Sequence, residues 1–394
     1  MVGALDTMRF LHTADWHLGR TLNGVDLIDD QAFALEQLLA YAADARLDAV
    51  VVAGDIFDRG VPPPAAVTLF DDTVHRLVVD LGLPTIAIAG NHDDPVRLAA
   101  HARLLRDRGL HIVGPPANPV ERVTFDGADG RLCFHALPFL DPPHARAAFG
   151  LPATTHAEAM VAALQHADRS DADARHVAVA HAFVAGGAES SSERLVNVVG
   201  EAGLVPAERF DGFDYVALGH LHRPQRVGER ARYSGSLLKY SLGEAGDAKG
   251  FGIVELSESG VTYEQVPIHP RRDVREVRAT LDELLAMLPS DDYVYVALLD
   301  AAPVLNAMAK VRTVFPNALQ VRRDPPQRRA PTLSRAPKDA AAEPREAPPP
   351  DVRRKTDIEL FAEFVREAAD AELTPAQRAA FAEVAQQARG KEIR

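Results

Sequence analysis

The sequence predicts an α/β protein whose main domain is a four-layer α/β/β/α sandwich: two sheets packed face to face, with helices on both outer sides. Short β-branched runs, such as residues 49–53, suit strands that are buried on both faces. These runs alternate with amphipathic helical stretches, which indicates βαβ units around parallel strands. The second half of this domain is richer in strands, and a small α+β module and a pair of helices follow it.

Length, charge and cysteine content restrict the class of protein. The chain has 394 residues, enough for two or three domains, and a net charge of −13. This charge argues against a nucleic-acid binder that relies on bulk basicity, but metal ions or a basic partner can serve a nuclease instead. The single Cys133 excludes an internal disulfide and a thiolate metal cluster. No apolar run of roughly eighteen residues and no signal-peptide pattern occurs, so we expect a cytoplasmic protein without membrane association.

The first half of the main domain, which starts at residue 8, predicts three strand–helix pairs. The apolar spacing of Phe33, Leu38 and Tyr41 indicates one helix, and a run of three prolines at 62–64 opens the next. The predicted strands are 8–14, 49–53 and 84–89, and the predicted helices are 30–45, 62–78 and 95–108.

The second half of the main domain, up to residue 270, predicts further strands and one helix. The apolar runs are short and several end directly in histidines. Predicted strands are 132–137, 176–180 and 215–218, with a helix over 155–167, and a closing meander over 233–236, 252–256 and 261–266. Two sheets packed face to face therefore account for residues 8–270.

Two further segments follow the main domain. Residues 271–322 alternate strands near 274–277, 293–299 and 318–321 with two helices, as a small βαβαβ module. Residues 323–355 form a linker that is rich in Pro, Ala and Arg and lacks periodicity. The basic excess of this linker fits a solvated tether or a nucleic-acid contact.

Residues 356–394 predict two amphipathic helices. The first carries an apolar stripe, and the second begins at Thr374 with capping-box spacing to Gln377. Two such helices bury little surface between themselves, so they either fold back on the core or bind helices of a partner. The stripe consists of Ile358, Phe361, Phe364 and Val365.

Residues that suit metal binding follow five of the predicted strands. Taken singly, each has an ordinary role: His181 as a structural histidine, Asn91 as a helix cap and Asp55 as a turn residue. Their recurrence indicates a shared site, because ligands bind at the carboxyl ends of strands in open α/β sheets. The set comprises Asp15, His17, Asp55, Asn91, His92, His181, His220 and His222.

The chemistry of this set points to a two-metal centre. Carboxylate, amide and imidazole donors suit borderline ions such as Mn²⁺, and no thiolate is present to favour a structural zinc. Two ions about 3.5–4 Å apart need a bridging carboxylate, for which Asp55 is the candidate. Such a pair activates water and stabilises charge on a phosphoryl group, so the sequence predicts phosphoester hydrolysis. The imidazole of His92 suits proton donation to a leaving oxygen near neutral pH.

In order and spacing, these residues resemble the five motifs of the calcineurin-like metallophosphoesterases. The motifs are Asp15-x-His17, Gly54-Asp55-x-x-Asp58, Gly90-Asn91-His92-Asp93, a lone His181 and Gly219-His220-x-His222. Within that superfamily, the stretches HTADWHLGR and VVAGDIFDRGVPPP and the module after residue 270 resemble the SbcD family. That family comprises the nuclease subunits of bacterial SbcC–SbcD complexes, and the resemblance covers residues 8–320. We call residues 271–322 the capping module, after the corresponding part of the family.

The resemblance implies a role for each motif residue. It implies one metal held by Asp15, His17 and His222, another held by Asn91, His181 and His220, and Asp55 bridging the two.

Four residues would act around these ligands. The resemblance implies that His92 is the general acid or charge stabiliser beside the scissile phosphate, oriented by Asp93, with Asp58 supporting the ligands. Arg59 completes a GDxxDRG form that also occurs in Ser/Thr phosphoprotein phosphatases, where the arginine contacts phosphate. In this chain, a DNA-phosphate contact or a solvated loop position fits Arg59 equally well.

The resemblance also implies an activity and partners. It implies a Mn²⁺-dependent nuclease, with Mg²⁺ as a substitute, that cuts double-stranded DNA ends 3′ to 5′ and single strands or hairpins endonucleolytically. Such nucleases work in repair, recombination and replication with an ATPase that has a long coiled coil. The apolar stripe of the C-terminal helices would bind the base of that coiled coil, and helices at 62–78 or 94–108 would contribute to a homodimer.

Two alternatives remain from the sequence. A phosphatase or cyclic-nucleotide phosphodiesterase would use the same ligands but would not need the capping module or the C-terminal helices. A catalytically silent scaffold that only docks DNA ends would not need His92. A Walker A loop is absent from the sequence, so any ATP dependence must come from a partner.

Overall fold

The computed structural model describes residues 7–127, 130–190, 192–193, 204–324, 362, 374–375 and 377–381. The chain divides into two units, residues 1–327 and 328–394, which we describe separately. Among the described residues, no helix is both long enough and apolar enough to cross a membrane.

The first sheet has six strands in the order β14-β13-β1-β4-β5-β6. Strands β1, β4, β5 and β6 run parallel, and β13 pairs antiparallel with β1. In β4, Val50 and Val52 face the helix side while Val51 faces the second sheet, so both faces are buried, as the β-branched run predicts. The strands are β1 (Met8–Thr13), β4 (Ala49–Val52), β5 (Thr85–Ile88), β6 (Leu110–Val113), β13 (Gly250–Ser257) and β14 (Gly260–Pro267).

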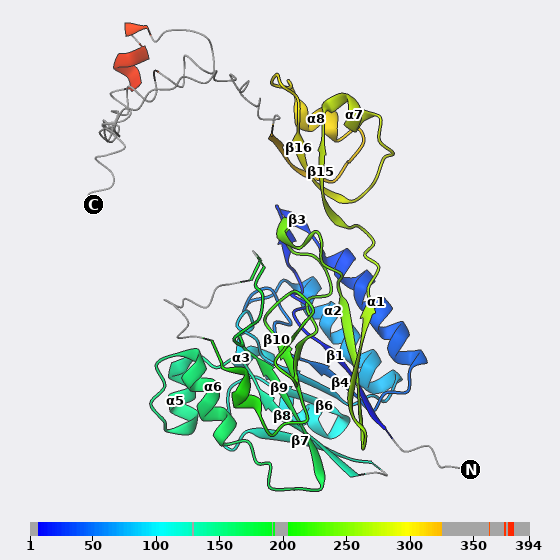
Figure 1. Ribbon diagram of the computed structural model, residues 1–394, viewed down its shortest axis with the longest axis vertical. Coiled ribbons are helices and arrows are strands. Elements are labelled where there is room, and N and C mark those ends of the chain that lie inside the picture. The colour runs from blue at the N-terminus through cyan, green and yellow to red at the C-terminus, as the bar shows by residue number, and fades with distance from the viewer. Residues whose placement is uncertain are drawn as a thin grey trace, which may run out of the picture. The chain divides into compact units, whose positions relative to one another are not determined.

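Helices α1 (Ile28–Asp44) and α2 (Pro64–His75) cover the outer face of the first sheet (Figure 1). Leu38 of α1 joins one hydrophobic cluster with Phe70 and Val74 of α2, as the helical spacing predicts. Tyr41 packs against this cluster, but the prediction is wrong for Phe33, which is 44% exposed. Pro64 stands in the first turn of α2, where its missing N–H removes no helical hydrogen bond. A five-residue π-helix, Arg76–Asp80, continues α2.

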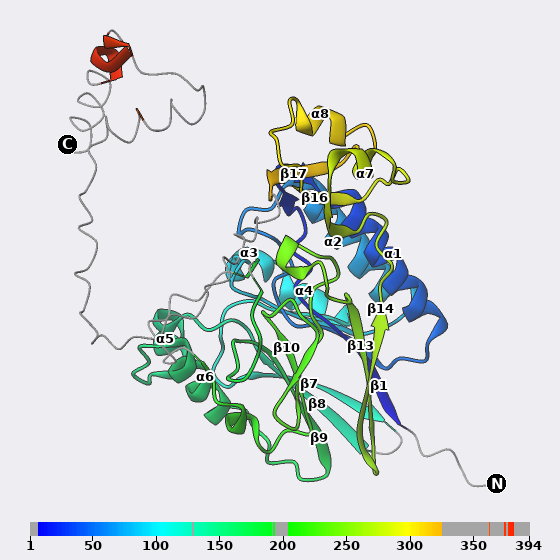
Figure 2. The same ribbon diagram turned by 45° about the horizontal axis from the view of Figure 1, so that its top comes forward.

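The second sheet also has six strands, in the order β11-β12-β10-β9-β8-β7. Helices α5 (Pro142–Phe149) and α6 (His156–Gln165) pack on its outer face through Phe149, Met160 and Leu164 (Figure 2). The strands are β7 (Glu121–Gly127), β8 (Gly130–Leu137), β9 (Ala174–His181), β10 (Tyr215–Gly219), β11 (Gln225–Val227) and β12 (Ala231–Tyr233).

A separate cluster fills the space between the two sheets. Phe10 and Val51 of the first sheet meet Phe134 and Val177 of the second sheet there. The Phe10 and Phe134 rings contact edge to face, with centroids 5.1 Å apart. Three hydrophobic clusters between four layers confirm the predicted α/β/β/α sandwich.

The capping module is a three-stranded parallel sheet with two short helices, as predicted. Its own cluster of apolar residues includes Leu284, Val296 and Phe315. The Tyr293 hydroxyl and the Arg272 guanidinium both donate to the carboxylate of Asp30 in α1, at 2.7 Å each, and join the module to the main domain. The elements are β15 (Val274–Ala279), α7 (Leu281–Leu285), β16 (Tyr293–Leu298), α8 (Ala307–Val311) and β17 (Ala318–Arg323).

Three predicted elements are wrong in detail. The helix predicted over 95–108 is broken into α3 (Pro95–Leu98), α4 (Ala102–Leu105) and a 3-10 turn, because His101 has a left-handed φ of 64°. The predicted closing meander is divided: β12 joins the second sheet, whereas β13 and β14 form a hairpin in the first. Strand β17 ends at Arg323, one residue inside the predicted linker.

Several strands carry too weak a signal for the sequence to predict them. They are β6, β7, β11 and the two-residue strands β2 (Thr21–Leu22) and β3 (Val25–Asp26). Residues 325–355 of the predicted linker and the apolar stripe of Ile358, Phe361, Phe364 and Val365 lie outside the described residues. In the second unit, the capping pair is present: the Gln377 amide donates to Thr374 Oγ1 at 3.3 Å, and the Thr374 amide donates to Gln377 Oε1 at 3.0 Å.

Candidate metal centre

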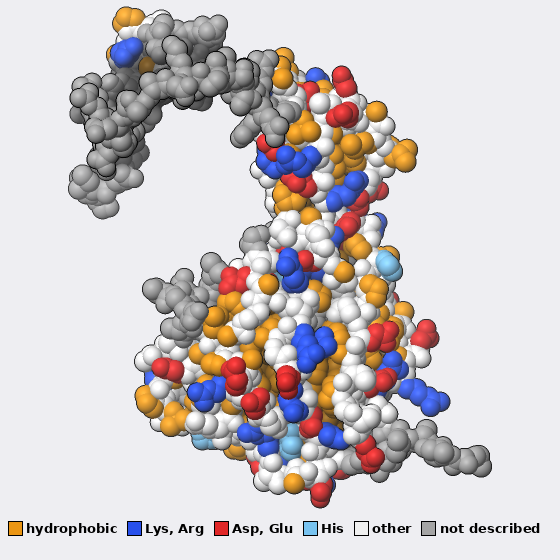
Figure 3. Space-filling model, in the orientation of Figure 1, with side chains coloured by type: hydrophobic (Ala, Val, Ile, Leu, Met, Phe, Trp, Pro, Cys, Tyr) orange, Lys and Arg blue, Asp and Glu red, His pale blue; other side chains and the backbone are white. Residues whose placement is uncertain are grey.

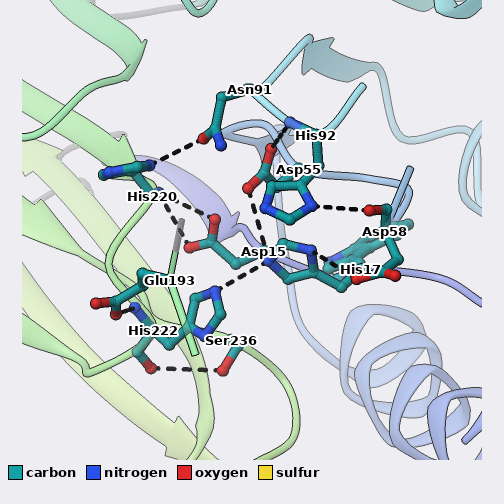
Figure 4. Close-up of polar contacts among 12 residues, drawn as sticks. Asp15, His17, Asp55, Asp58, Asn91, His92, Glu193, His220, His222 and Ser236 are labelled. Carbon is teal, nitrogen blue, oxygen red and sulfur yellow. Dashed lines mark hydrogen bonds and ion pairs between the residues drawn. The ribbon is translucent and has the colours of Figure 1, made fainter. Parts of the chain in front are cut away.

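The carboxyl ends of five strands, β1, β4 and β5 in the first sheet and β9 and β10 in the second, lead into one cluster of polar side chains. Figure 4 shows residues from both sheets pointing toward one another. All eight residues that the sequence singles out belong to this cluster, and seven of them are buried. The eight are Asp15, His17, Asp55, Asn91, His92, His181, His220 and His222.

The backbone of this cluster adopts conformations that side chains usually avoid. The φ angles of Asp15, His17, Asp55 and His220 are 54°, 46°, 49° and 110°. Each such residue costs roughly 1–3 kcal/mol, and such strain concentrates at functional sites. Hydrogen bonds from the Asp15 amide to the Gly54 carbonyl, at 3.0 Å, and from the His17 amide to the Asp55 carbonyl, at 2.9 Å, hold these turns.

Glycines let the loops approach one another. A Cβ on Gly90 would overlap the carboxylate and the backbone nitrogen of Asp55, and a Cβ on Gly54 would overlap the ring of His181. Gly54 also has a φ of 93°, which favours glycine by itself. The glycines that interrupt the predicted strands therefore serve the close packing of the polar cluster.

One group of donor atoms comes from Asp15, His17 and His222, and these atoms lie within 4.8 Å of one another. The Nε2 atoms of His17 and His222 face each other at 2.9 Å. The Nδ1 atom of His222 lies 2.7 Å from Ser192 Oγ, which leaves its Nε2 for the cluster. The His17 Nδ1 atom is buried and has no hydrogen-bond partner. Two imidazole nitrogens and a carboxylate thus converge on one point.

A second group comes from Asn91, His181 and His220. The Asn91 Oδ1 atom lies 3.0 Å from His181 Nε2 and 3.0 Å from His220 Nδ1. The Nδ1–H of His181 donates to the Ala53 carbonyl at 2.9 Å, which fixes the tautomer and leaves Nε2 as a ligand atom. These contacts place an amide oxygen and two imidazoles around a second point.

Asp55 lies between the two groups. Its Oδ2 atom is 3.6 Å from His17 Nε2 on one side and 3.5 Å from His181 Nε2 on the other. Its Oδ1 atom accepts a hydrogen bond from the His92 amide at 2.8 Å. A carboxylate in this position suits the bridging role that the sequence predicts, because one oxygen faces both donor groups.

Burial shapes the charges of the cluster. Burial raises the pKa of Asp15 well above its usual range, and burial lowers the pKa of His17 and of His220. Although burial opposes the ionisation of Asp55, the His181 ring holds the pKa of that carboxyl well below its usual range. Burial likewise opposes the charged form of His181, but the Asp55 carboxylate raises the pKa of this imidazole to about 9.

These donors fit a pair of divalent metal ions. Ionised carboxylates and neutral imidazoles are the forms that ligate metals, so a bound divalent cation would displace the protons of Asp15 and His181 and would compensate the buried negative charge. The donor set contains carboxylate, amide and imidazole but no thiolate, and three triplets of its members place their donor atoms within 4.8 Å of one another.

The surroundings of His92 differ from the prediction. Its ring Nδ1–H donates to the backbone carbonyl of Asp58 at 2.8 Å, so Asp58 rather than Asp93 orients the imidazole. The Asp93 carboxylate instead accepts hydrogen bonds from the backbone amides of Gly90, Ile56 and Phe57, at 2.9–3.1 Å. Asp93 therefore ties the two ligand loops together and acts through the backbone.

The side chains of Asp58 and Arg59 take different positions. The Asp58 carboxylate lies 3.8 Å from His17 Nδ1 and 3.4 Å from the Arg20 guanidinium, behind the ligands. Arg59 is exposed on the same loop.

Two buried charges behind His222 were not predicted from the sequence. Glu244 is fully buried, its Oε1 lies 3.5 Å from His222 Nδ1, and its Oε2 pairs with the Lys249 ammonium at 2.6 Å. The same ammonium donates to the His222 carbonyl at 2.6 Å. No local pattern reveals these residues, because Glu and Lys in a Gly-rich polar segment resemble an exposed loop.

A second pair that was not predicted supports the first ligand loop. The Gln31 side-chain amide donates to the His17 carbonyl at 2.7 Å and accepts from the Gly19 amide at 3.0 Å. The Tyr240 hydroxyl donates to the Trp16 carbonyl. Gln31 occupies a buried position of α1, and a polar residue within an apolar helical stripe is the signal that could have found it.

Comparison with known proteins agrees with this geometry. Residues 8–224, which include all eight clustered residues, match the calcineurin-like phosphoesterase family. Residues 270–368 match the family described as the type 5 capsule protein repressor C-terminal domain. The chain is 32% identical over 320 residues to the SbcD component of the nuclease SbcCD from Staphylococcus saprophyticus, an alignment that covers 79% of this chain and 84% of that protein.

Proposed function

Because this chain belongs to the SbcD nuclease subunits of the calcineurin-like phosphoesterases, we propose that it is a Mn²⁺-dependent DNA nuclease that works with an SbcC-type ATPase. Membership makes the chain a metal-dependent hydrolase of the nuclease class. The observation that carries the proposal is the position of the Asp55 carboxylate, which faces His17 and His181 at 3.6 and 3.5 Å.

Two Mn²⁺ ions are the proposed cofactors, with Mg²⁺ as a substitute. Asp15, His17 and His222 would hold one ion. Asn91, His181 and His220 would hold the other, and Asp55 would bridge the two. When bound, such a pair supplies an activated water and positive charge for the phosphoryl oxygens.

The protein's own groups position the substrate and move the proton. The bond from His92 Nδ1–H to the Asp58 carbonyl leaves Nε2 as the atom that donates a proton to the leaving 3′ oxygen. Asp93 acts one step away, because its bonds to the Gly90 and Phe57 amides keep the His92 loop against the Asp55 loop. Arg59 is exposed beside this loop and would contact a neighbouring DNA phosphate.

The proposed substrates are double-stranded ends, cut 3′ to 5′, and single strands and hairpins, cut endonucleolytically, in break and hairpin processing. Polarity and hairpin preference rest on the family resemblance. On the face shown in Figure 3, Lys and Arg side chains are interspersed with Asp and Glu rather than gathered in one basic surface. The net charge of −13 points the same way, so we propose that the ATPase partner supplies the basic groove. The proposed site of this activity is the cytoplasm, where chromosomal DNA would be the substrate.

We propose that the C-terminal helices bind the base of the ATPase coiled coil. Within 356–394, the apolar stripe at Ile358, Phe361, Phe364 and Val365 would face the partner. The double substitution Phe361→Glu and Phe364→Glu should abolish co-purification with the ATPase, because it places two charges in an apolar contact. Retained co-purification would refute this surface.

A homodimer is proposed through segment 62–78, which contains α2, or through segment 94–108, which contains α3 and α4. Val67, Val96 and Leu104 project apolar side chains that are 46%, 71% and 76% exposed there. Exposed apolar side chains that form a patch are typical of subunit contacts. Replacement of Leu104 and Val96 by Lys should convert the dimer to a monomer in sedimentation experiments, and an unchanged dimer would exclude this surface.

The first experiment separates the nuclease from a phosphatase. The purified chain is incubated with Mn²⁺, Mg²⁺ or EDTA on end-labelled duplex DNA and, in parallel, on p-nitrophenyl phosphate mono- and diesters. Manganese-dependent shortening of the duplex, absent with EDTA, is the expected result. Ester hydrolysis without DNA cleavage, even after addition of the ATPase, would favour a phosphatase. Binding without any cleavage would favour a DNA-end scaffold.

A further inference from the structure

Phe139 lies beside the candidate metal centre but outside the hydrophobic core. The residue is partly exposed and belongs to none of the four hydrophobic clusters of the described chain. Its ring contacts two imidazoles: it stacks on His156, with centroids 4.8 Å apart, and meets His181 edge to face at 6.3 Å. Core packing therefore does not account for an aromatic residue at this position.

The Phe139 ring is held in a defined place. Its stack on His156 is nearly parallel, with an angle of 14° between the planes. His156 is buried, and its Nδ1–H donates to the Leu140 carbonyl at 3.1 Å, so one side of the stack is fixed. The Phe139 amide donates to the Ala89 carbonyl at 2.8 Å, immediately before the loop of Asn91. The ring is thus tied to the strand end that carries two of the clustered residues.

Two other phenylalanines lie near histidines but also pack with a hydrophobic cluster. Phe149 stacks on His166 with centroids 5.2 Å apart, but Phe149 is only 7% exposed and belongs to the hydrophobic cluster between the second sheet and helices α5 and α6. Phe183 lies 6.0 Å from the His220 ring and packs against the same cluster. Phe139 differs from Phe149 because part of its surface remains accessible. It differs from Phe183, which is also partly exposed, because Phe139 packs against no hydrophobic cluster of the described residues and is stacked nearly parallel on a buried imidazole.

We propose that Phe139 stacks on a nucleobase next to the scissile phosphodiester and so selects nucleotide substrates whose base is unstacked. This inference rests on the proposed nuclease function. A fixed, partly exposed aromatic ring suits any base, because every base has a π-face, and such stacking tolerates sequence. A paired terminal base must leave its helix to reach the ring, so frayed ends are the preferred duplex substrate.

The test uses the full-length chain with Mn²⁺ and single-stranded oligonucleotides. Each oligonucleotide carries a normal base or a tetrahydrofuran abasic residue at the 3′-terminal or the penultimate position. The wild type should cut one of the abasic substrates about tenfold more slowly than the normal one. Phe139→Leu should cut the normal substrate about tenfold more slowly than the wild type does. It should cut that abasic substrate at the wild-type rate. Phe139→Trp should restore the preference, since it keeps an aromatic face.

Two controls separate stacking from support of the metal centre. Phe149→Leu removes a phenylalanine–histidine stack from the core, so it should lower the melting temperature and leave the base preference unchanged. Calorimetric titration with Mn²⁺ should give the same affinity for the wild type and for Phe139→Leu.

Three outcomes would overturn the inference. The first is a wild type without any preference for the normal base. The second is a Phe139→Leu variant that cuts normal and abasic substrates more slowly by the same factor, or that binds Mn²⁺ more weakly than the wild type. Either result would mean that the ring acts by supporting His181. In the third, the wild type hydrolyses bis(p-nitrophenyl) phosphate but cuts no DNA, with or without the ATPase; this outcome overturns the proposed function as well, whereas the first two leave it standing.

Discussion

The main domain around the metal centre and the capping module share one arrangement of strands and helices, but the polar residues after their strands differ in burial and in role. In both, parallel strands alternate with helices, and polar residues follow the strand ends. In the main domain, Asp15, Asp55 and His181 are buried at these positions, and two of the three have positive φ angles. In the capping module, the corresponding Asp300 is partly exposed and accepts a hydrogen bond from the Leu281 amide at 2.9 Å.

The other strand ends of the capping module serve local structure as well. Thr280 caps α7 with Glu283, and Asp324 pairs with Arg278 at 2.6 Å. A polar residue after a buried strand is therefore not sufficient for a site. Burial of several donor atoms against one another, on a strained backbone, distinguishes the metal centre from the module.

The largest expected effect tests this distinction with one substitution in each region. Asp55→Asn should reduce Mn²⁺-dependent DNA cleavage by at least about 10³-fold, because it removes the charge shared by both donor groups and loss of one preorganised electrostatic contact alone costs roughly 10²–10³. Asp300→Asn, the matched change at a strand end of the capping module, should leave cleavage unchanged. Gel assays on labelled duplex measure both, and substantial residual cutting by Asp55→Asn would remove the bridging role.

His92→Gln separates chemistry from metal binding within the centre. Loss of the Nε2 proton donor should lower the cleavage rate by roughly 10²-fold or more, the usual contribution of general acid catalysis. Mn²⁺ affinity, measured by calorimetry, should stay near that of the wild type, since His92 is not among the proposed ligands. Cleavage at the wild-type rate would contradict this role.

Glu244→Gln probes the buried charge behind His222. The change removes the partner of the Lys249 ammonium, 2.6 Å away, and weakens the support of the His222 ring. Loss of such a supporting contact typically costs roughly 10–100-fold in metal affinity, and we expect a decrease in this range. Glu283→Gln, which alters only a helix cap of the capping module, is the control. Equal Mn²⁺ affinity for Glu244→Gln and the wild type would show that Glu244 does not support the ligand.

The smallest expected effect concerns the contact between the two regions. Tyr293→Phe removes the hydroxyl that donates to Asp30 at 2.7 Å and should lower the free energy of unfolding by about 1 kcal/mol. Tyr295→Phe should cost less, because its bond to Asn23 Oδ1 is longer, at 3.1 Å, and partly exposed. Urea unfolding measures both, and hydrolysis of small esters should not change. A change in ester hydrolysis would show that the module influences the centre directly.

Local patterns were sufficient to predict most of the architecture. The β-branched run of β4 and the amphipathic spacing of α1 depend on neighbours in the sequence, and both elements form as predicted. The capping pair of Thr374 and Gln377 is likewise local. The break at His101 was not predicted, because an αL residue within an apolar helical pattern leaves no mark in that pattern.

The sequence by itself determined which donors follow which strands, and therefore the chemistry that the chain can perform. Residue type and position after a strand are local properties, so Asp55 and His181 could be named before any fold was known. The two-metal hypothesis rests on the donor types and on their recurrence at five strand ends.

Only the tertiary structure decided how these donors meet and what surrounds them. Three features depend on segments that are far apart in the chain. They are the sheet that β13 and β14 join, the orientation of His92 by the Asp58 carbonyl, and the burial of Glu244. Strand pairing and burial are set by non-local packing, which maximises buried apolar area across the whole domain. For that reason Phe139 resembles an ordinary core residue in the sequence, and only the fold places it beside the metal centre.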